Sequence, residues 1–444
     1  MAEIRVEPRL LRGFRDYLPD EMIPRQRMLA TITDVFERHG FAPFATPALE
    51  YSEIVLGKYG DDAEKLLFRF EDNGGRDVCM RYELTTSLAR VAAQYQQLPK
   101  PLKFYQIGPV WRAERPGQGR FREFYQCDVD IIGSESVLAE FECIQIDYDV
   151  LTALDVGGFT IRVNNRLLLD ALAKLLGIES VEQKHALGRT IDKLPSQGEE
   201  VVRGLLKTDV SLDDGQIERV FAYMGISGTN AEILDQVNAF FGDISEAKEG
   251  VARLRTLLEY CVASGIPEGY VQLDMSIIRG LDYYTGTVYE TLIDDLPEFG
   301  SVMSGGRYDG LVSVFTGQNV PAVGISVGID RLLAGLQKIG RIESKATLTE
   351  LLVTVFDDST ASVSIAAATE LRNRDIRAEL YAETGKLAKQ MKYANRQEIP
   401  FALIIGPDEA QSGRMTLRNM KTGDQHDCTS IDEIVAIMRA NPTR

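Results

Sequence analysis

The chain has 444 residues, of which 44% are hydrophobic and 26% charged, and its formal net charge is -17. This length allows two or three domains with separate cores, and the composition is that of a soluble globular protein. No run of 18 apolar residues and no charged-then-apolar leader occurs, so we expect a cytoplasmic protein without a membrane span. The acidic charge excludes nucleic-acid binding over the whole surface, so such a partner would need a local cationic patch.

The cysteines and histidines limit the chemistry further. The five cysteines form no C-x-x-C pair, which favours reduced thiols over a disulfide framework or a zinc site. The histidines His39, His185 and His426 are far apart in the sequence and offer little material for a metal centre or a Ser-His triad. We therefore assign no metal to protein side chains.

The first 340 residues alternate between strand and helix patterns. Residues 21–39 have helical apolar spacing and end at Gly40, which is typical of a helix C-cap. A strand pattern then ends at Pro47, and a hairpin turns at the sequence RPGQG. An acidic helical insertion is expected at about residues 175–262. The other predicted strands are residues 103–114, 120–133, 271–277, 283–292 and about 301–315, and 322–337 is predicted to be a strand running into a helix.

The last hundred residues have a different pattern. Short apolar strands alternate with helical runs, which predicts a small α/β domain with a largely parallel sheet. Its predicted strands are residues 350–356, 376–381 and 401–407, and its predicted helices are about 360–374 and 384–396. The stretch 340–350 is the expected linker, so we predict domains at 1–340 and 349–444.

The hairpin around the RPGQG turn gathers four arginines in an acidic chain. In a hairpin that turns here, facing residues would have numbers that sum to about 234. Alternate side chains would then lie on the same face of the hairpin, and one of the two faces would be polar. That face holds Arg112, Glu114, Arg120, Arg122, Phe124, Gln126, Asp128 and Asp130. The other face holds Trp111, Phe121, Tyr125, Cys127, Val129 and Ile131, so we expect Cys127 to pack in the core.

Two interpretations of the polar face are open. A solvated strand face with surface ion pairs is the default for such a hairpin. However, arginine is suited to bidentate capture of phosphate, and the acidic groups lie at the far end of the strand. The face could therefore hold a polyanion at one end and a cationic or N–H-donating ligand at the other.

Several segments together resemble one known family. RAERPGQGRFREF resembles motif 2 of the class II aminoacyl-tRNA synthetases, and the string through YQCDVDIIG is similar to the version in the histidyl-tRNA synthetase family. RYELTTSLAR, RGLDYYTG and SGGRYDGL resemble the amino-acid-binding turn and the two histidine-specific motifs of that family. GISVGIDRL resembles motif 3, and residues 21–50 resemble the motif 1 dimer element. The resemblance covers essentially the whole chain.

The resemblance implies a fold and a reaction. The fold would be an α+β catalytic core with a mixed antiparallel sheet, interrupted by the helical insertion and followed by a C-terminal α/β anticodon-binding domain. The reaction would be activation of L-histidine with ATP, aided by Mg²⁺, followed by transfer to tRNA on a cytoplasmic homodimer.

The resemblance also implies a role for individual residues. Arg279 and Arg112 would be catalytic. ATP would be bound by Arg112, Glu114, Arg120 and Arg331. Histidine would be bound by Glu83, Leu84, Thr85, Arg112, Gln126, Asp130, Arg279, Tyr283 and Tyr284. Asp130 is shorter than the glutamate that many bacterial members carry, but it keeps the carboxylate.

The run 371–396 is the expected tRNA contact in the C-terminal domain. It holds seven Lys or Arg and three Asp or Glu, a net charge of +4. A solvated helix face is the default for such a run, whereas an anticodon stem would require such a patch.

Two other functions fit parts of the sequence. One is the non-catalytic relative that serves as regulatory subunit of ATP phosphoribosyltransferase, although it lacks the anticodon domain and several catalytic groups. The other is a synthetase for a different amino acid of the same subclass, which leaves both histidine-specific motifs unexplained.

Overall fold

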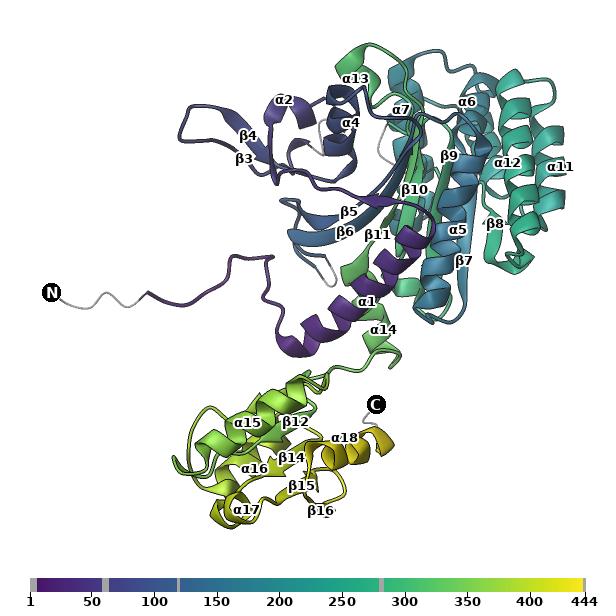
Figure 1. Ribbon diagram of the computed structural model, residues 1–444. Coiled ribbons are helices and arrows are strands. Elements are labelled where there is room, and N and C mark those ends of the chain that lie inside the picture. Colours follow the sequence, from purple (N-terminus) through teal and green to yellow (C-terminus); the bar gives the residue numbers. More distant parts are fainter. Residues whose placement is uncertain (1–5, 58–63, 118–119, 279–282, 442–444) are drawn as a thin grey trace. The chain divides into compact units, whose positions relative to one another are not determined.

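The structure is a computed structural model that describes residues 6–57, 64–117, 120–278 and 283–441 (Figure 1). It divides into two compact units, residues 1–15 with 28–342 and residues 16–27 with 343–444. The predicted site residue Arg279 lies outside the described residues. Among the described helices, none combines the length and the apolarity that a membrane crossing requires.

The larger unit is built on an eight-stranded mixed sheet. Its strand order is β1-β5-β6-β11-β10-β9-β7-β8, and only the β1–β5 and β7–β8 pairs are parallel. The strands are β1 (Ala42–Pro43), β5 (Leu102–Trp111), β6 (Glu123–Ile132), β7 (Phe159–Asn165), β8 (Val271–Leu273), β9 (Thr287–Ile293), β10 (Met303–Arg307) and β11 (Ala322–Val327). A separate small sheet has the order β2 (Leu49–Tyr51), β4 (Asp77–Met80) and β3 (Arg69–Glu71).

The register of the β5–β6 hairpin is the predicted one. Leu102 pairs with Ile132 and Trp111 with Glu123, so paired positions sum to 234. Cys127 and Val129 are consequently fully buried in the main core, as predicted. The strands end at Trp111 and begin again at Glu123, so the prediction that strand structure continues through the arginines was wrong. Phe121, predicted on the core face, instead stacks with Arg15, whose guanidinium carbon is 4.3 Å from the ring centroid.

Helices cover the sheet and form the insertion. From Met28 onward, α1 contributes to the main core, and α5 contacts β6, β7, β10 and β11. The helices of this part of the chain are α1 (Pro19–Arg38), α2 (Ser52–Val55), α4 (Thr85–Gln94), α5 (Val137–Ala153), α6 (Arg166–Leu175), α13 (Ser313–Thr316) and α14 (Ile329–Lys338), with short 3-10 turns at Glu268–Tyr270 and Pro297–Phe299.

The predicted helical insertion is observed. It consists of α7 (Val181–Ile191), α8 (Leu194–Gln197), α9 (Glu199–Thr208), α10 (Asp214–Met224), α11 (Asn230–Phe241) and α12 (Ser245–Ser264). Asp213 and Thr229 begin α10 and α11 with reciprocal capping boxes, which satisfy backbone N–H groups in the first turn. Gly265 ends α12 in the left-handed conformation at φ 85°.

The smaller unit contains a five-stranded sheet in the order β13-β12-β14-β15-β16. β12 pairs in parallel with β13 and β14, but β15 and β16 add an antiparallel pair that the sequence reading missed. The strands are β12 (Leu351–Val353), β13 (Ala378–Leu380), β14 (Phe401–Ile404), β15 (Met415–Asn419) and β16 (Gln425–Cys428). The helices are α15 (Ala361–Arg372), α16 (Leu387–Arg396), α17 (Pro407–Ser412) and α18 (Ile431–Ala440).

A buried aspartate makes the stability of the larger unit depend on pH. Asp147 on α5 is fully buried; Thr291 donates a hydrogen bond to one of its oxygens, and the other oxygen has no partner among the described residues. Burial raises the pKa of Asp147 to about 7. Because the folded state then binds this proton more tightly than the unfolded state does, stability falls as pH rises from the unfolded pKa to about 7.

We therefore expect the melting temperature of Asp147→Asn to rise relative to wild type between pH 5 and pH 8, since the amide cannot ionise. The exposed Asp235→Asn is the control and should show a constant difference from wild type. A difference between Asp147→Asn and wild type that does not change with pH would contradict this expectation.

Candidate active site

Two adjoining pockets lie along the polar face of β6 and its neighbours. Arg112, Arg120 and Arg331 line the first, which we call the cationic pocket. Glu83, Asp128, Asp130 and Asp192 line the second, which we call the acidic pocket. The residues that line both are Arg112, Arg120, Gln126, Ser304 and Ser326. The two pockets are therefore neighbours with a shared wall, cationic at one end and acidic at the other.

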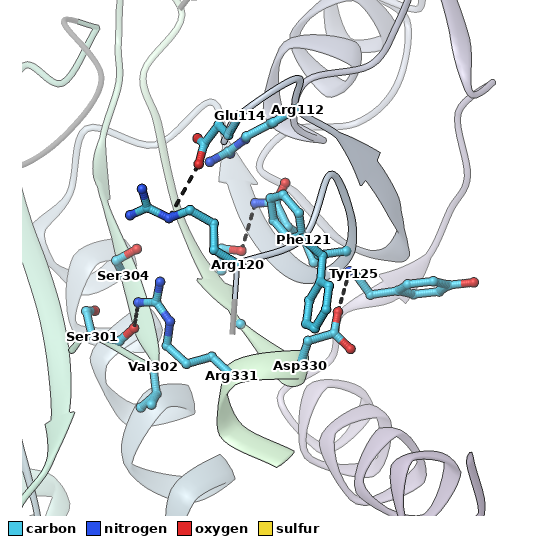
Figure 2. A pocket seen from close by; sticks show the side chains of 14 residues that line it. Arg112, Glu114, Arg120, Phe121, Tyr125, Ser301, Val302, Ser304, Asp330 and Arg331 are labelled. Atoms are coloured by element: carbon cyan, nitrogen blue, oxygen red, sulfur yellow. Dashed lines mark hydrogen bonds and ion pairs between the residues drawn. The ribbon is translucent and has the colours of Figure 1, made fainter. Parts of the chain in front are cut away.

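The cationic pocket draws its arginines from the hairpin and from α14 (Figure 2). The Arg112 guanidinium lies over the Tyr82 ring, 4.3 Å from its centroid, and its Nε donates to the Tyr82 carbonyl. Arg120 pairs with Glu114 at 3.5 Å and is largely exposed. Arg331 donates to the Ser301 carbonyl at 2.6 Å. Three planar guanidinium groups around one space suit an anion with several oxygens, such as a polyphosphate.

The hairpin is attached to α14 by a carboxylate. The backbone N–H of Tyr125 donates to Asp330 Oδ2 at 2.9 Å, and Arg15 lies 3.8 Å from Asp330 Oδ1. Asp330 precedes Arg331 in the first turn of α14, where a negative charge is favourable. This contact therefore fixes the distance between the motif 2 strand and the motif 3 arginine.

The acidic pocket is built from segments that lie far apart in the sequence. Glu83 precedes α4 and accepts bonds from the backbone N–H and hydroxyl of Thr86, and from the Tyr283 hydroxyl at 3.3 Å. Asp130 on β6 accepts a bond from the Tyr308 hydroxyl at 2.5 Å. The Tyr283 and Tyr284 rings are 4.9 Å apart and complete one wall. Buried carboxylates and hydroxyls at these positions suit a ligand that donates N–H bonds.

The position of Asp130 requires a glycine on the neighbouring strand. Gly324 pairs with Asp130, and a side chain there would place its Cβ 2.0 Å from Asp130 Oδ1. No heavy atom can approach that closely, so glycine at 324 makes room for the carboxylate. Burial raises the pKa of Asp130 to about 7; the Tyr308 hydroxyl opposes this effect and the charge of Glu83 adds to it.

A buried ion pair holds the end of β10 and the segment after Tyr284. Glu140 on α5 is fully buried and accepts bonds from Arg307 Nε at 2.5 Å and from Arg253 of α12 at 2.6 Å. The Arg307 carbonyl in turn accepts the backbone N–H of Thr285 at 2.8 Å. The insertion helix α12 is thereby connected to the tyrosine wall of the acidic pocket.

The structure brings together most of the predicted site residues. Those that line one or both pockets are Glu83, Thr85, Arg112, Glu114, Arg120, Gln126, Asp130, Tyr283, Tyr284 and Arg331. The Leu84 side chain is buried and lines neither pocket. Arg279, the predicted catalytic residue, lies outside the described residues.

Sequence reasoning missed several pocket residues. Tyr308 lies inside the quoted SGGRYDGL motif but received no role, although a tyrosine beside two glycines could have indicated one. Asp192, Pro195 and Ser196 of the insertion also line the acidic pocket, and no local pattern distinguishes them from surface residues. Asp128 shares the predicted polar face with Gln126 and Asp130, so alternation alone could have selected it.

Comparison with known proteins identifies the family of the chain. The family model described as Histidyl-tRNA synthetase matches residues 13–332, and the one described as Anticodon binding domain matches residues 351–441. The chain belongs to the histidyl-tRNA synthetase family. It is 40% identical over 423 residues to a histidine–tRNA ligase of Rhodopirellula baltica, covering 95% of each chain. It is 39% identical to the corresponding ligase of Wolinella succinogenes, covering 98% of each.

Solved structures of this family have the same fold. The crystal structure of a histidyl-tRNA synthetase from a Nostoc species matches with a TM-score of 0.85 at 29% identity, covering 98% of this chain and 100% of that one. A Bacillus halodurans structure, described as an ATP phosphoribosyltransferase regulatory subunit or histidyl-tRNA synthetase, matches with a TM-score of 0.73 at 23% identity, covering 87% of this chain and 97% of that one. At that identity the likeness shows the fold alone. The family and the fold class inferred from the motifs are confirmed.

The contact between Gly324 and Asp130 gives a direct test of the pocket. Gly324→Ala should force β11 or Asp130 to shift and destabilise the protein by about 1–3 kcal/mol, the usual cost of overpacking. Gly310→Ala is the matched control because a Cβ there would meet no atom within 4 Å. Melting temperatures measure both. Equal melting temperatures for the two variants would contradict the close approach of Gly324 to Asp130.

Proposed function

We propose that the protein is a histidine–tRNA ligase. It activates L-histidine with ATP to form histidyl-adenylate and pyrophosphate, and it then transfers histidine to the 3′ end of tRNA. The observation that carries this proposal is the shared wall between the cationic and acidic pockets. An amino acid in one pocket and a triphosphate in the other would meet beside Arg112 and Gln126, which line both.

The cationic pocket is the proposed ATP site. Arg112 would contact the α-phosphate, while Glu114, Arg120 and Arg331 would contact the adenine and the outer phosphates. Mg²⁺ commonly binds through one or two carboxylates together with substrate phosphates, and Glu114 is a carboxylate in this pocket. Such an ion would neutralise phosphate charge.

The acidic pocket is the proposed histidine site. Glu83, Thr85 and Gln126 would receive the α-ammonium group, with Leu84 beside them in the chain. Asp130 and Tyr284 would hydrogen-bond the imidazole, and Tyr283 would line the pocket. Side chains that require polar partners reject wrong substrates strongly, because an unmatched buried group is costly.

The chemical step needs positioning more than proton transfer. The substrate carboxylate is ionised near pH 7, so it can attack the α-phosphate without a general base. Catalysis then consists of alignment and of neutralising charge on the phosphoryl oxygens. Arg112 would supply one positive charge, and Arg279, which opens the RGLDYYTG motif, would supply the other.

The smaller unit is the proposed tRNA-binding part. Within the run 371–396, Arg374 pairs with Glu370 and Asp432, and Lys389 pairs with Glu383. Arg377, Lys386, Lys392 and Arg396 are exposed and have no ion pair among the described residues. These four cations are the proposed phosphate contacts. We place the catalytic core at 1–340 and the anticodon-binding domain at 349–444, in a cytoplasmic homodimer.

The main alternative is a non-catalytic regulatory paralogue of ATP phosphoribosyltransferase. The proposed catalytic groups Arg112, Gln126, Arg279 and Arg331 are all kept in this chain, and so is the C-terminal unit. These features favour the ligase.

Histidine-dependent exchange between ATP and pyrophosphate tests the ligase directly. Purified protein should catalyse this exchange with histidine in the absence of tRNA. No other amino acid should support exchange at a comparable rate. Arg279→Ala should lower the rate by roughly 100-fold or more, as expected for the loss of one transition-state charge donor. Arg69→Ala, which removes an exposed partner of Asp77, is the control. Absence of exchange in wild type, together with binding to a phosphoribosyltransferase, would favour the regulatory alternative.

The tRNA proposal is tested on α16. The double variant Lys392→Glu/Arg396→Glu should lower kcat/KM for tRNA charging by roughly tenfold or more and reduce the salt dependence of tRNA binding, since phosphate contacts release counterions. Pyrophosphate exchange should not change. Lys421→Glu, an exposed lysine in the same unit, is the control. Charging unaffected by the double variant would exclude α16 as an RNA contact.

A further inference from the structure

Asp128 lies between Gln126 and Asp130 on the pocket side of β6, and the proposed function leaves it without a role. Its side chain lines the acidic pocket and is only 3% exposed. Neither of its carboxylate oxygens has a well-aligned hydrogen bond among the described residues, although the Ser326 hydroxyl on the paired strand interacts with this side chain. Gln126 Oε1 has no hydrogen-bond partner there either. Three buried acceptor atoms on neighbouring positions of one strand face therefore lack well-aligned donors.

This arrangement is costly for a purely structural residue. A buried polar atom without a partner loses its hydration and gains nothing in return. Other buried acids of this unit accept hydrogen bonds. Thr291 donates to Asp147, and Arg253 and Arg307 donate to Glu140. Because Asp128 faces a cavity, a group that enters the cavity can supply the missing donors.

The chemistry of the acceptors indicates which part of a ligand fits. An ammonium group offers three N–H donors and a positive charge, which matches two carboxylate oxygens and one amide oxygen. Glu83, the family's ammonium acceptor, already accepts bonds from Thr86 and Tyr283. Asp130 already accepts a hydrogen bond from Tyr308. It lies two residues beyond Asp128 on the same strand face, about 7 Å further from Gln126.

We infer that Asp128 binds the α-ammonium group of the amino-acid substrate together with Gln126. This inference rests on the proposed function and adds a residue to its histidine site. Asp128 then supplies the negative charge that Gln126 lacks, and it orients the substrate so that the carboxylate points toward Arg112 and the imidazole toward Asp130.

The electrostatics of the site agree with this role. Burial raises the pKa of Asp128 well above its usual range; the charges of Asp130 and Glu83 raise it further, and Ser326 and Arg112 oppose them. An arriving ammonium favours the ionised carboxylate.

The test compares Asp128→Asn and Asp128→Ser with wild type by calorimetry. Three probes are titrated: histidine, histidinol (which keeps the ammonium and lacks the carboxylate) and 3-(imidazol-4-yl)propionate (which lacks the ammonium). Histidine and histidinol should bind roughly tenfold to 100-fold more weakly to both variants, the range for a lost charged hydrogen bond. The propionate should bind all three proteins within about twofold.

Melting of the unliganded proteins separates a binding role from a structural one. Because Asp128 has no well-aligned hydrogen bond to lose, both variants should melt at or above the wild-type temperature, while histidine should stabilise them less. Asp147→Asn, which changes an equally buried aspartate outside both pockets, should keep the full stabilisation by histidine.

Several results would overturn the inference. One is that the variants melt at a lower temperature than wild type or fail to fold, and another is that their affinity for histidine is unchanged. A third is an equal loss of affinity for the propionate, which would mean that Asp128 contacts the imidazole and not the ammonium group. The proposed function fails separately, if wild type itself neither binds histidine nor catalyses exchange.

Discussion

The pairing of β6 between β5 and β11 is the constraint on which the site depends. Strand alternation sends every second side chain of β6 to the core, where Cys127, Val129 and Ile131 are buried. The intervening positions, Gln126, Asp128 and Asp130, must then face the pockets. A shift of one residue would exchange the two sets and bury the carboxylates in the hydrophobic core. The same strand register therefore both buries the apolar side chains in the core and places the polar side chains at the pockets.

The polar face itself is kept at an energetic cost. Because burial disfavours the charged form, it raises the pKa of Asp130 to about 7 and the pKa of Asp128 well above its usual range. Arg112 is oriented by the Tyr82 carbonyl and ring, and Arg331 donates to the Ser301 carbonyl, so both guanidinium groups are positioned before a ligand arrives. Sites prepared for charged substrates commonly lower the stability of the empty protein in this way.

The insertion is more closely joined to the site than its place in the sequence indicates. Asp192, Pro195 and Ser196 line the acidic pocket, and Arg253 of α12 reaches the buried Glu140 that also holds Arg307. Removing one partner from a buried pair leaves an uncompensated charge, so loss of either arginine should destabilise this connection. The acidic helices therefore form part of the wall around the amino-acid pocket.

The sequence by itself determined the hairpin register, the helical insertion, the alternation in the last hundred residues and most of the pocket residues. These features follow from local periodicity, turn residues and motifs that keep their order along the chain. The antiparallel β15–β16 pair, the stacking of Phe121 on Arg15, and the meeting of Tyr308 and Gly324 at Asp130 were decided only by the tertiary structure. The physical reason is that each depends on which distant segments become neighbours, and local periodicity does not encode contacts between residues that are, as with Asp130 and Tyr308, 178 positions apart.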